Sequence, residues 1–279
     1  MLSNNPLRQY FRQPAIYVGL PSKGQFYPAG VLTMPPTGEL PVYPMTAIDE
    51  ITYRTPDALF NGQATVSVIQ SCVPDIKDGW AMPALDIDTL LVSIRIASYG
   101  HDMEFGTKCP KCSHESEQTI DLRSVLDKMK TPDYTQSLKA GDVEIFFRPM
   151  SYKNINDNNQ LQYESQKMLQ GLPESDSSEA EKMTALGAAL KRITEITVSA
   201  LSQSIAAVKT PQALVNESEY ISEFLSNCDK KLFNRVRDHI VALKDQAEMQ
   251  PLKIKCSECT HEYEQPITLD MSSFFEQDS

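Results

Sequence analysis

The sequence predicts a mainly α-helical protein with a small β element, and three observations lead to this expectation. Apolar residues recur at helical spacing over much of residues 46–99 and 179–248. A cysteine-bearing segment with alternating polar and apolar residues occurs twice, which is typical of β-hairpins. The first 45 residues are rich in proline and glycine, which preclude a long helix. We therefore expect a helical domain that carries two hairpins and an extended N-terminal arm.

The N-terminal arm, residues 1–45, combines helix-breaking residues with many apolar side chains. A disordered tail seldom carries so many aromatic residues, because such segments are poor in groups that can be buried. We therefore expect the arm to lie against a surface, which is either its own domain or a neighbouring protein. Its apolar residues include Tyr10, Phe11, Ile16, Tyr17, Val18, Leu20, Phe26 and Tyr27.

Helix start and stop signals divide residues 46–130 into short helices. Thr46 is followed by acidic residues and is expected to cap the first helix. Asp88 is expected to begin a helix that Gly100 ends. The other helices of this part are expected to begin at Thr55-Pro56, to span 62–73 and to lie near 121–129.

Residues 131–250 are expected to contain one strand, a linker and three helices. The longest helix carries an apolar stripe that includes Met183, Leu186 and Leu190, and stripes of this kind most often pack in a core. With about 1.5 Å of rise per residue this helix would be about 45 Å long. The expected elements are a strand at 142–148, a polar helix at 151–170, a linker at 171–178, and helices at 179–208 and 229–248.

These elements divide the chain into four parts. The arm spans 1–45, and helices with the first cysteine hairpin span 46–130. The strand and the long helices occupy 131–250, and the second cysteine hairpin with a C-terminal tail occupies 251–279.

One segment occurs twice, at a constant offset of 147 residues. Residues 108–122 and 255–269 are identical at nine of fifteen positions, and each contains a Cys-x-x-Cys pair. Two cysteines three positions apart can both turn their sulfur atoms inward around a tight loop, which provides half of a tetrahedral site. A closed site requires four ligands. We therefore expect one structural zinc ion per chain, bound by Cys109, Cys112, Cys256 and Cys259 at the tips of two zinc-knuckle hairpins.

Other interpretations of the cysteines remain open. His114 and His261 each follow a cysteine pair, so two separate zinc sites are conceivable, although each would have at most three ligands. We expect these histidines to lie outside the ligand set and to donate a hydrogen bond that holds the knuckle. A thioredoxin-like redox role is disfavoured because such pairs begin a helix, whereas these precede strand-like sequence. Cys72 and Cys228 are expected to be small buried apolar residues.

Composition and motifs disfavour several classes of function. The net charge of −11 opposes binding to nucleic acid, which depends on Lys and Arg. No apolar run approaches the ~20 residues that a membrane span requires. The chain has no phosphate-binding loop, no nucleophile elbow and no His-Glu-x-x-His pair. We therefore expect a protein that is not an enzyme and that has no nucleic-acid, membrane or small-molecule partner.

Several short strings lie between residues 16 and 125. They include Leu-Pro-Ser-Lys-Gly-Gln-Phe-Tyr at 20–27 and Thr-Pro-Asp-Ala-Leu-Phe-Asn-Gly at 55–62. These strings resemble the baseplate proteins of T-even-type contractile-tailed bacteriophages. The resemblance implies a virion or assembly protein of the tail baseplate, near its central hub, that is assembled in the bacterial host cytoplasm.

The same resemblance implies that the partners are other phage baseplate or hub proteins. Partner contacts are expected at Leu20, Pro21, Lys23, Phe26 and Tyr27 of the first string, and at Pro56, Leu59 and Phe60 of the second. Two alternatives remain, a tail assembly chaperone that is absent from the mature virion and a zinc-ribbon adaptor in nucleic-acid transactions.

Overall fold

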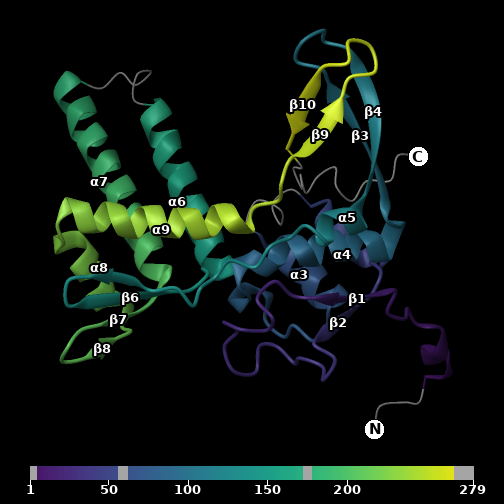
Figure 1. Cartoon of the computed structure of the whole chain (residues 1–279), viewed down its shortest axis with the longest axis horizontal. Coiled ribbons are helices and arrows are strands. Elements are labelled where there is room, and N and C mark those ends of the chain that lie inside the picture. Colours follow the sequence, from purple (N-terminus) through teal and green to yellow (C-terminus); the bar gives the residue numbers. More distant parts are fainter. Residues whose placement is uncertain (1–4, 56–61, 172–177, 267–279) are drawn as a thin grey trace. The chain divides into compact units, whose positions relative to one another are not determined.

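The computed structural model describes residues 5–55, 62–171 and 178–266, and the chain divides into two compact units. Unit 1 comprises Met1–Lys130 and Glu248–Ser279, and unit 2 comprises Thr131–Ala247 (Figure 1). Unit 2 is thus inserted between the two chain segments that build unit 1. The helix expected from Thr55-Pro56 onward and most of the expected 171–178 linker lie outside the described residues.

Most of the N-terminal arm folds onto unit 1. Strands β1 (Ile16–Gly19) and β2 (Glu39–Val42) pair antiparallel, with Ile16 opposite Val42. Inward-facing side chains of both strands are buried, among them Val18 and Leu40, and both strands lie against helix α4 (Ile87–Tyr99). The sequence left open whether the arm lies against its own domain or against a neighbouring protein. In the structure, the segment from β1 onward lies against its own unit.

Short helices form the rest of the first segment of unit 1. Thr46 caps the first of them in a capping box with Asp49, as expected. Gly100, with φ of 91°, follows the last residue of α4, which confirms the predicted stop. The predicted start was wrong, since Asp86 and not Asp88 stands at the N-cap of α4. The helices are α1 (Ala47–Tyr53), α3 (Gln63–Cys72), α4 (Ile87–Tyr99) and α5 (Leu122–Leu126).

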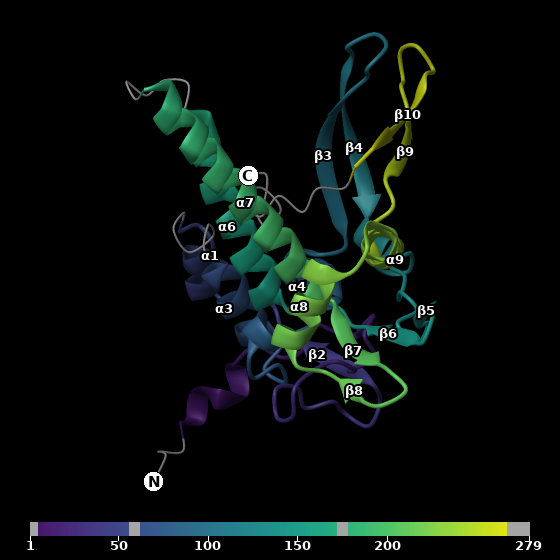
Figure 2. The same cartoon turned by 90° about the vertical axis from the view of Figure 1, so that its left-hand side faces the viewer.

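Two β-hairpins complete unit 1, and they come from opposite ends of the chain's sequence. Strands β3 (Asp102–Lys108) and β4 (Glu115–Asp121) form the first, and β9 (Leu252–Lys255) and β10 (Glu262–Gln265) form the second. The two hairpins lie side by side (Figure 2). They form separate two-stranded sheets, so no main-chain ladder joins them within the described residues.

Unit 2 is built on a four-stranded antiparallel sheet in the order β5-β6-β7-β8. An apolar core that includes Ile145, Ile205 and Ile221 lies between this sheet and the neighbouring helices. The strands are β5 (Leu138–Ala140), β6 (Val143–Phe147), β7 (Ile205–Lys209) and β8 (Leu214–Val215). The helices are α6 (Tyr152–Gly171), α7 (Glu179–Gln203), α8 (Ser218–Asn227) and α9 (Lys230–Ala247).

The structure corrects the expected helix 179–208 in two ways. The helix ends at Gln203, and Ile205–Lys209 instead forms β7, which pairs with β6. The continuous apolar run Ile205–Val208 suits a strand once β6 provides a partner, so tertiary pairing overrides the helical spacing. The apolar stripe is also not core packing along its whole length, because Met183 and Leu190 are 69% and 53% exposed.

Candidate metal centre

Four cysteine sulfur atoms come together at the tips of the two hairpins of unit 1. All four lie within 4.8 Å of one another. The Sγ atoms of Cys109 and Cys259 are 3.7 Å apart, and those of Cys112 and Cys256 are 3.6 Å apart. A disulfide requires about 2.05 Å, whereas four thiolates at Zn–S distances of ~2.3 Å lie about 3.8 Å from one another. The spacing therefore fits a tetrathiolate metal site and not a pair of disulfides.

Each knuckle is closed by the same two main-chain hydrogen bonds. In the first hairpin the N–H of Cys109 donates to the carbonyl of His114 over 2.9 Å, and the N–H of Ser113 donates to the carbonyl of Cys109 over 2.9 Å. These bonds make a tight loop that turns both sulfur atoms to one side. The second hairpin repeats them, from Cys256 to His261 at 2.9 Å and from Thr260 to Cys256 at 3.0 Å.

The residue after each second cysteine has a left-handed backbone. Ser113 has φ of 60° and Thr260 has φ of 57°. Residues other than glycine seldom adopt this conformation, and a β-branched threonine does so least readily. Both knuckles therefore contain the same unfavourable turn. This repetition indicates that bringing the two sulfur atoms to one side of the loop requires a left-handed backbone at this position.

The two histidines contribute through their main chain. Their carbonyl oxygens accept the hydrogen bonds that close the knuckles, and His261 also stacks on Tyr263 with ring centroids 6.4 Å apart. The hydroxyl groups of Tyr263 and Thr107 are 2.8 Å apart and link the two hairpins below the sulfur cluster. The side-chain hydrogen bond expected for His114 and His261 stays a prediction.

The environment of the sulfur atoms favours some thiolates and opposes others. Burial opposes ionisation of Cys109, but hydrogen bonds from the main-chain N–H groups of Cys112 and Lys111 and from the Cys112 and Cys259 thiols together lower the pKa to about 7. The N–H of Cys259 likewise lowers the pKa of Cys256. For Cys112 a main-chain hydrogen bond from His114 favours the thiolate, yet contacts with the other thiols raise the pKa to about 12. Like charges this close cannot all form without a cation, so four thiolates require a metal ion.

A buried carboxylate organises the turn that contains several expected partner contacts. Asp86 is fully buried, and it accepts hydrogen bonds from the Ser22 N–H at 2.8 Å, the Ser22 hydroxyl at 2.6 Å and the Tyr27 hydroxyl at 2.9 Å. Burial raises the pKa of Asp86 to about 6 although these hydrogen bonds lower it. Sequence reasoning missed this site, because nothing near residue 86 indicates that its partners lie about 60 residues earlier.

The expected partner contacts thus occupy different environments. The Leu20 side chain is buried in unit 1, and Pro21 is half-buried. Tyr27 hydrogen-bonds Asp86, whereas Lys23 and Phe26 are exposed on the turn, with φ of 54° and 68°. Pro56, Leu59 and Phe60 lie outside the described residues.

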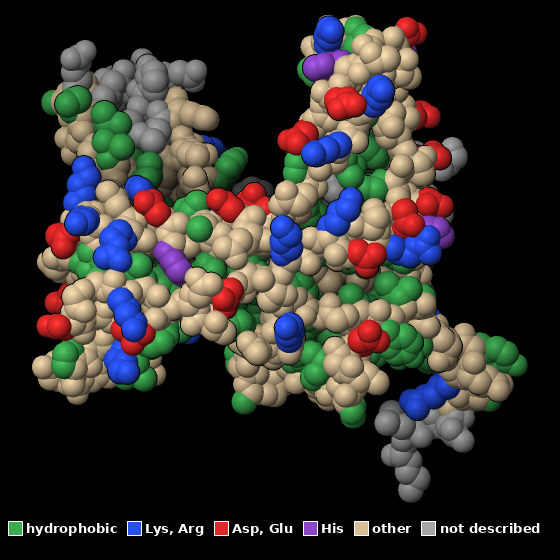
Figure 3. All heavy atoms as spheres, in the orientation of Figure 1, with side chains coloured by type: hydrophobic (Ala, Val, Ile, Leu, Met, Phe, Trp, Pro, Cys, Tyr) green, Lys and Arg blue, Asp and Glu red, His purple; other side chains and the backbone are tan. Residues whose placement is uncertain are grey.

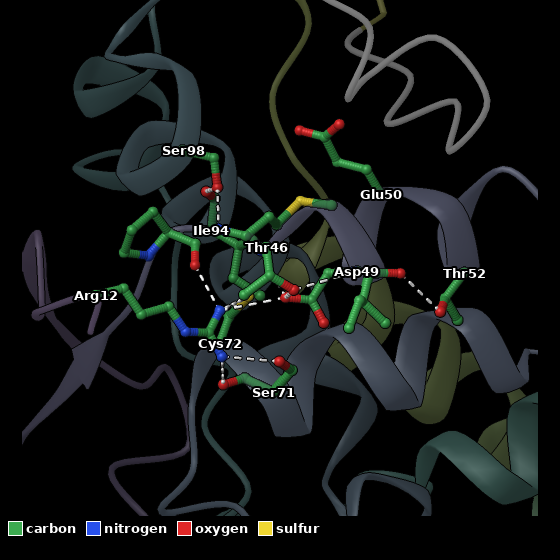
Figure 4. A network of polar contacts seen from close by, with 12 residues as sticks. Arg12, Thr46, Asp49, Glu50, Thr52, Ser71, Cys72, Ile94 and Ser98 are labelled. Carbon is green, nitrogen blue, oxygen red and sulfur yellow. Dashed lines mark hydrogen bonds and ion pairs between the residues drawn. The ribbon is translucent and has the colours of Figure 1, made fainter. Parts of the chain in front are cut away.

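Arg12 ties the arm to the helices of unit 1 (Figure 4). Its guanidinium donates to the carbonyls of Pro44 and Ser71 at 2.5 and 2.7 Å and pairs with Asp49 at 3.2 Å. Asp49 is also the acidic residue of the capping box of α1. One side chain thus connects the arm, α1 and α3. It could not be recognised from the sequence, where Arg12 is one of several cations.

Comparison with known proteins identifies a family. The family model described as T4 bacteriophage base plate protein matches residues 45–276. The match begins at the last residue of the arm and spans all of unit 2 and all four clustered cysteines. No curated protein and no solved structure matches the chain. Among the described residues, none of the helices is both long enough and apolar enough to cross a membrane.

Proposed function

The chain belongs to the T4 bacteriophage base plate protein family, and on that premise we propose that it is a non-enzymatic structural or assembly component of a contractile-tail baseplate, near the central hub. The observation that carries this proposal is the family match, which covers most of the chain. The protein acts as a component of the virion tail and contacts other tail proteins. It is assembled into the tail in the cytoplasm of the bacterial host.

One structural zinc ion stabilises unit 1 in this proposal. The Cys109–Cys259 and Cys112–Cys256 sulfur separations fit the edges of a ZnS₄ tetrahedron. The ion joins hairpins that no β-ladder joins, and it thereby ties residues 248–279 to the first segment of unit 1. Four sulfur ligands close the coordination sphere and leave no open position for a substrate, which favours a structural role over catalysis.

The partner contacts on the first string are best supported at Lys23 and Phe26. Both side chains are exposed, and both residues hold a left-handed backbone on a turn that Asp86 fixes from inside. Leu20 and Tyr27 support the same turn from its buried side. Lys23→Glu and Phe26→Ser are therefore expected to impair tail assembly while the purified variants retain zinc and thermal stability.

Mass spectrometry of purified virions tests the structural role. A structural component is present at a fixed number of copies per particle, and a tail assembly chaperone is absent from mature particles. A gold label on the C-terminus, located in electron micrographs of tails, then tests the position near the hub. Retention of the purified protein on DNA at low salt would instead favour the nucleic-acid adaptor.

Elemental analysis tests the metal. We expect about one zinc per chain, because four thiolate ligands complete one site. Cys256→Ser should lose the ion, and Cys228→Ser serves as the matched control because Cys228 lies outside the cluster. A metal-free protein with unchanged melting temperature would contradict the proposed clip.

A further inference from the structure

The N-terminal end of the arm displays large apolar side chains to solvent. Leu7, Tyr10, Phe11 and Tyr17 are 61%, 78%, 55% and 63% exposed. The first two belong to a short 3₁₀ helix, η1 (Pro6–Tyr10), that has no buried residue. This helix projects from the rest of unit 1, and hydrophobic side chains gather on it (Figures 1 and 3). We refer to these four residues as the N-terminal strip.

Within the part of the chain that the structure describes, the projecting helix buries none of its side chains, although burial usually stabilises so short an element. A single 3₁₀ turn has weak hydrogen-bond geometry and is marginal in water without packing against another surface. Here Asn5 caps η1, and an N–H to carbonyl hydrogen bond from Phe11 to Arg8 closes it. The local sequence therefore favours the turn, but the apolar side chains of η1 stay largely exposed among the described residues. Exposed apolar groups in such an arrangement indicate a contact with another molecule.

The strip is held in place at its C-terminal end. Arg12, directly after Phe11, is fixed by the hydrogen bonds to Pro44 and Ser71 and by the ion pair with Asp49. Tyr17 lies in β1, which is paired with β2. A ligand that covered the strip would thus order few additional residues, and this lowers the entropic cost of association.

Charge indicates what covers the strip. Residues 1–38 contain three of the 26 Lys and Arg residues and none of the 37 Asp and Glu residues. The remainder of the chain therefore has 23 basic and 37 acidic residues, a net charge of −14. Arg12 is paired with Asp49, which leaves Arg8 and Lys23 as the exposed cations of this segment. The segment that carries the apolar strip is therefore net positive on an otherwise acidic chain, and its charge complements the net charge of a second copy.

We propose that the N-terminal strip docks on the acidic remainder of a second copy of this protein, so that copies associate head to tail. A contact between two different surfaces of the same chain is heterologous, and it produces closed rings or open chains of copies. Attraction between the basic segment and the acidic surface promotes the encounter, and burial of the aromatic side chains holds the complex. The inference deepens the proposed assembly role and rests on it, by naming the partner.

Analytical ultracentrifugation of the zinc-loaded full chain tests this proposal. We expect association that rises with protein concentration and weakens as salt increases from about 50 mM to about 500 mM, because screening reduces the charge attraction. The double variant Tyr10→Ser, Phe11→Ser should weaken self-association by at least about tenfold, since aromatic anchors dominate interface energies. Both side chains are exposed in the isolated chain, so the variant should retain its zinc content and melting temperature.

Two further variants make the result specific. Ile48→Ser removes an apolar side chain that is 74% exposed on α1 of the same unit, and it should leave self-association unchanged. Arg8→Glu should weaken association more at low salt than at high salt. Specific interfaces usually have a Kd well below about 100 μM. A wild-type chain that stays monomeric at this concentration would therefore overturn the proposal, as would a double variant that associates as strongly as the wild type. Neither result bears on the presence of the protein in virions, which mass spectrometry decides separately.

Discussion

Unit 1 and unit 2 are stabilised by different kinds of interaction. Unit 2 is one continuous stretch of chain, and its sheet and helices enclose an apolar core that includes Ile145 and Val236. Unit 1 also has an apolar core, but it joins two distant chain segments, and it adds the sulfur cluster and buried polar ties at Asp86 and Arg12. We therefore expect the stability of unit 1 to depend on metal and pH, and the stability of unit 2 to depend mainly on how completely its apolar core is filled.

The largest effect is expected from loss of the metal. The sulfur atoms of Cys112 and Cys256 lie 144 positions apart in sequence, and a link across so long a loop stabilises the fold by up to about 5 kcal/mol. Cys256→Ser should therefore release zinc and destabilise unit 1 by this order. Trp80 is the single tryptophan of the chain and lies in unit 1, so its fluorescence reports this unfolding. Unchanged unfolding relative to Cys228→Ser would contradict the comparison.

A cavity in unit 2 should have the next largest effect. Ile205 is fully buried on β7, and Ile205→Ala should cost about 4 kcal/mol because it removes packed methylene groups and leaves a void. Circular dichroism should show earlier unfolding of helices, while the metal content stays equal to that of the wild type. If this variant lost zinc, the two units would not be energetically separate. Leu214→Ala, an exposed position on β8, is the control.

The stability of unit 1 should also depend on pH, because Asp86 is buried in it. The pKa of Asp86 is about 6 in the folded chain, above the ordinary value of 3.8, so the folded state binds more protons between these values. Its contribution to stability is thus greatest below about pH 4 and falls by up to about 3 kcal/mol as pH rises through 6. Asp86→Asn should remove this dependence from Trp80-monitored urea unfolding. Parallel pH profiles for the variant and the wild type would show that another group is responsible.

The smallest of these effects is expected at Arg12. Arg12→Ala leaves the Pro44 carbonyl, the Ser71 carbonyl and the Asp49 carboxylate without their donor, at a cost of about 2 kcal/mol. Urea unfolding monitored by Trp80 should detect the loss, while unit 2 is unaffected. Arg8→Ala is the matched control in the same arm, because its exposed side chain should change stability by less than about 0.5 kcal/mol.

Features that depend on neighbouring residues could be predicted from the sequence, and features that depend on distant residues could not. The cap at Thr46 and the stop at Gly100 were predictable because each acts within one helical turn. The repeat likewise indicated both hairpins, since a knuckle is built from residues that are neighbours in sequence. Strand β7 and the exposure of Met183 were not predictable, because apolar spacing does not state which element covers a side chain.

The local elements and the four cysteines of the cluster are readable from the amino-acid sequence, because capping residues and cysteine pairs act over a few positions. The hydrogen bonds of Asp86 to the turn at Ser22 and the anchoring of the arm by Arg12 appear only in the folded chain, since both contacts join residues far apart in the sequence. The tertiary structure also decides that Tyr10 and Phe11 stay exposed. Burial depends on what the rest of the chain places against a side chain, and no short stretch of sequence contains that information.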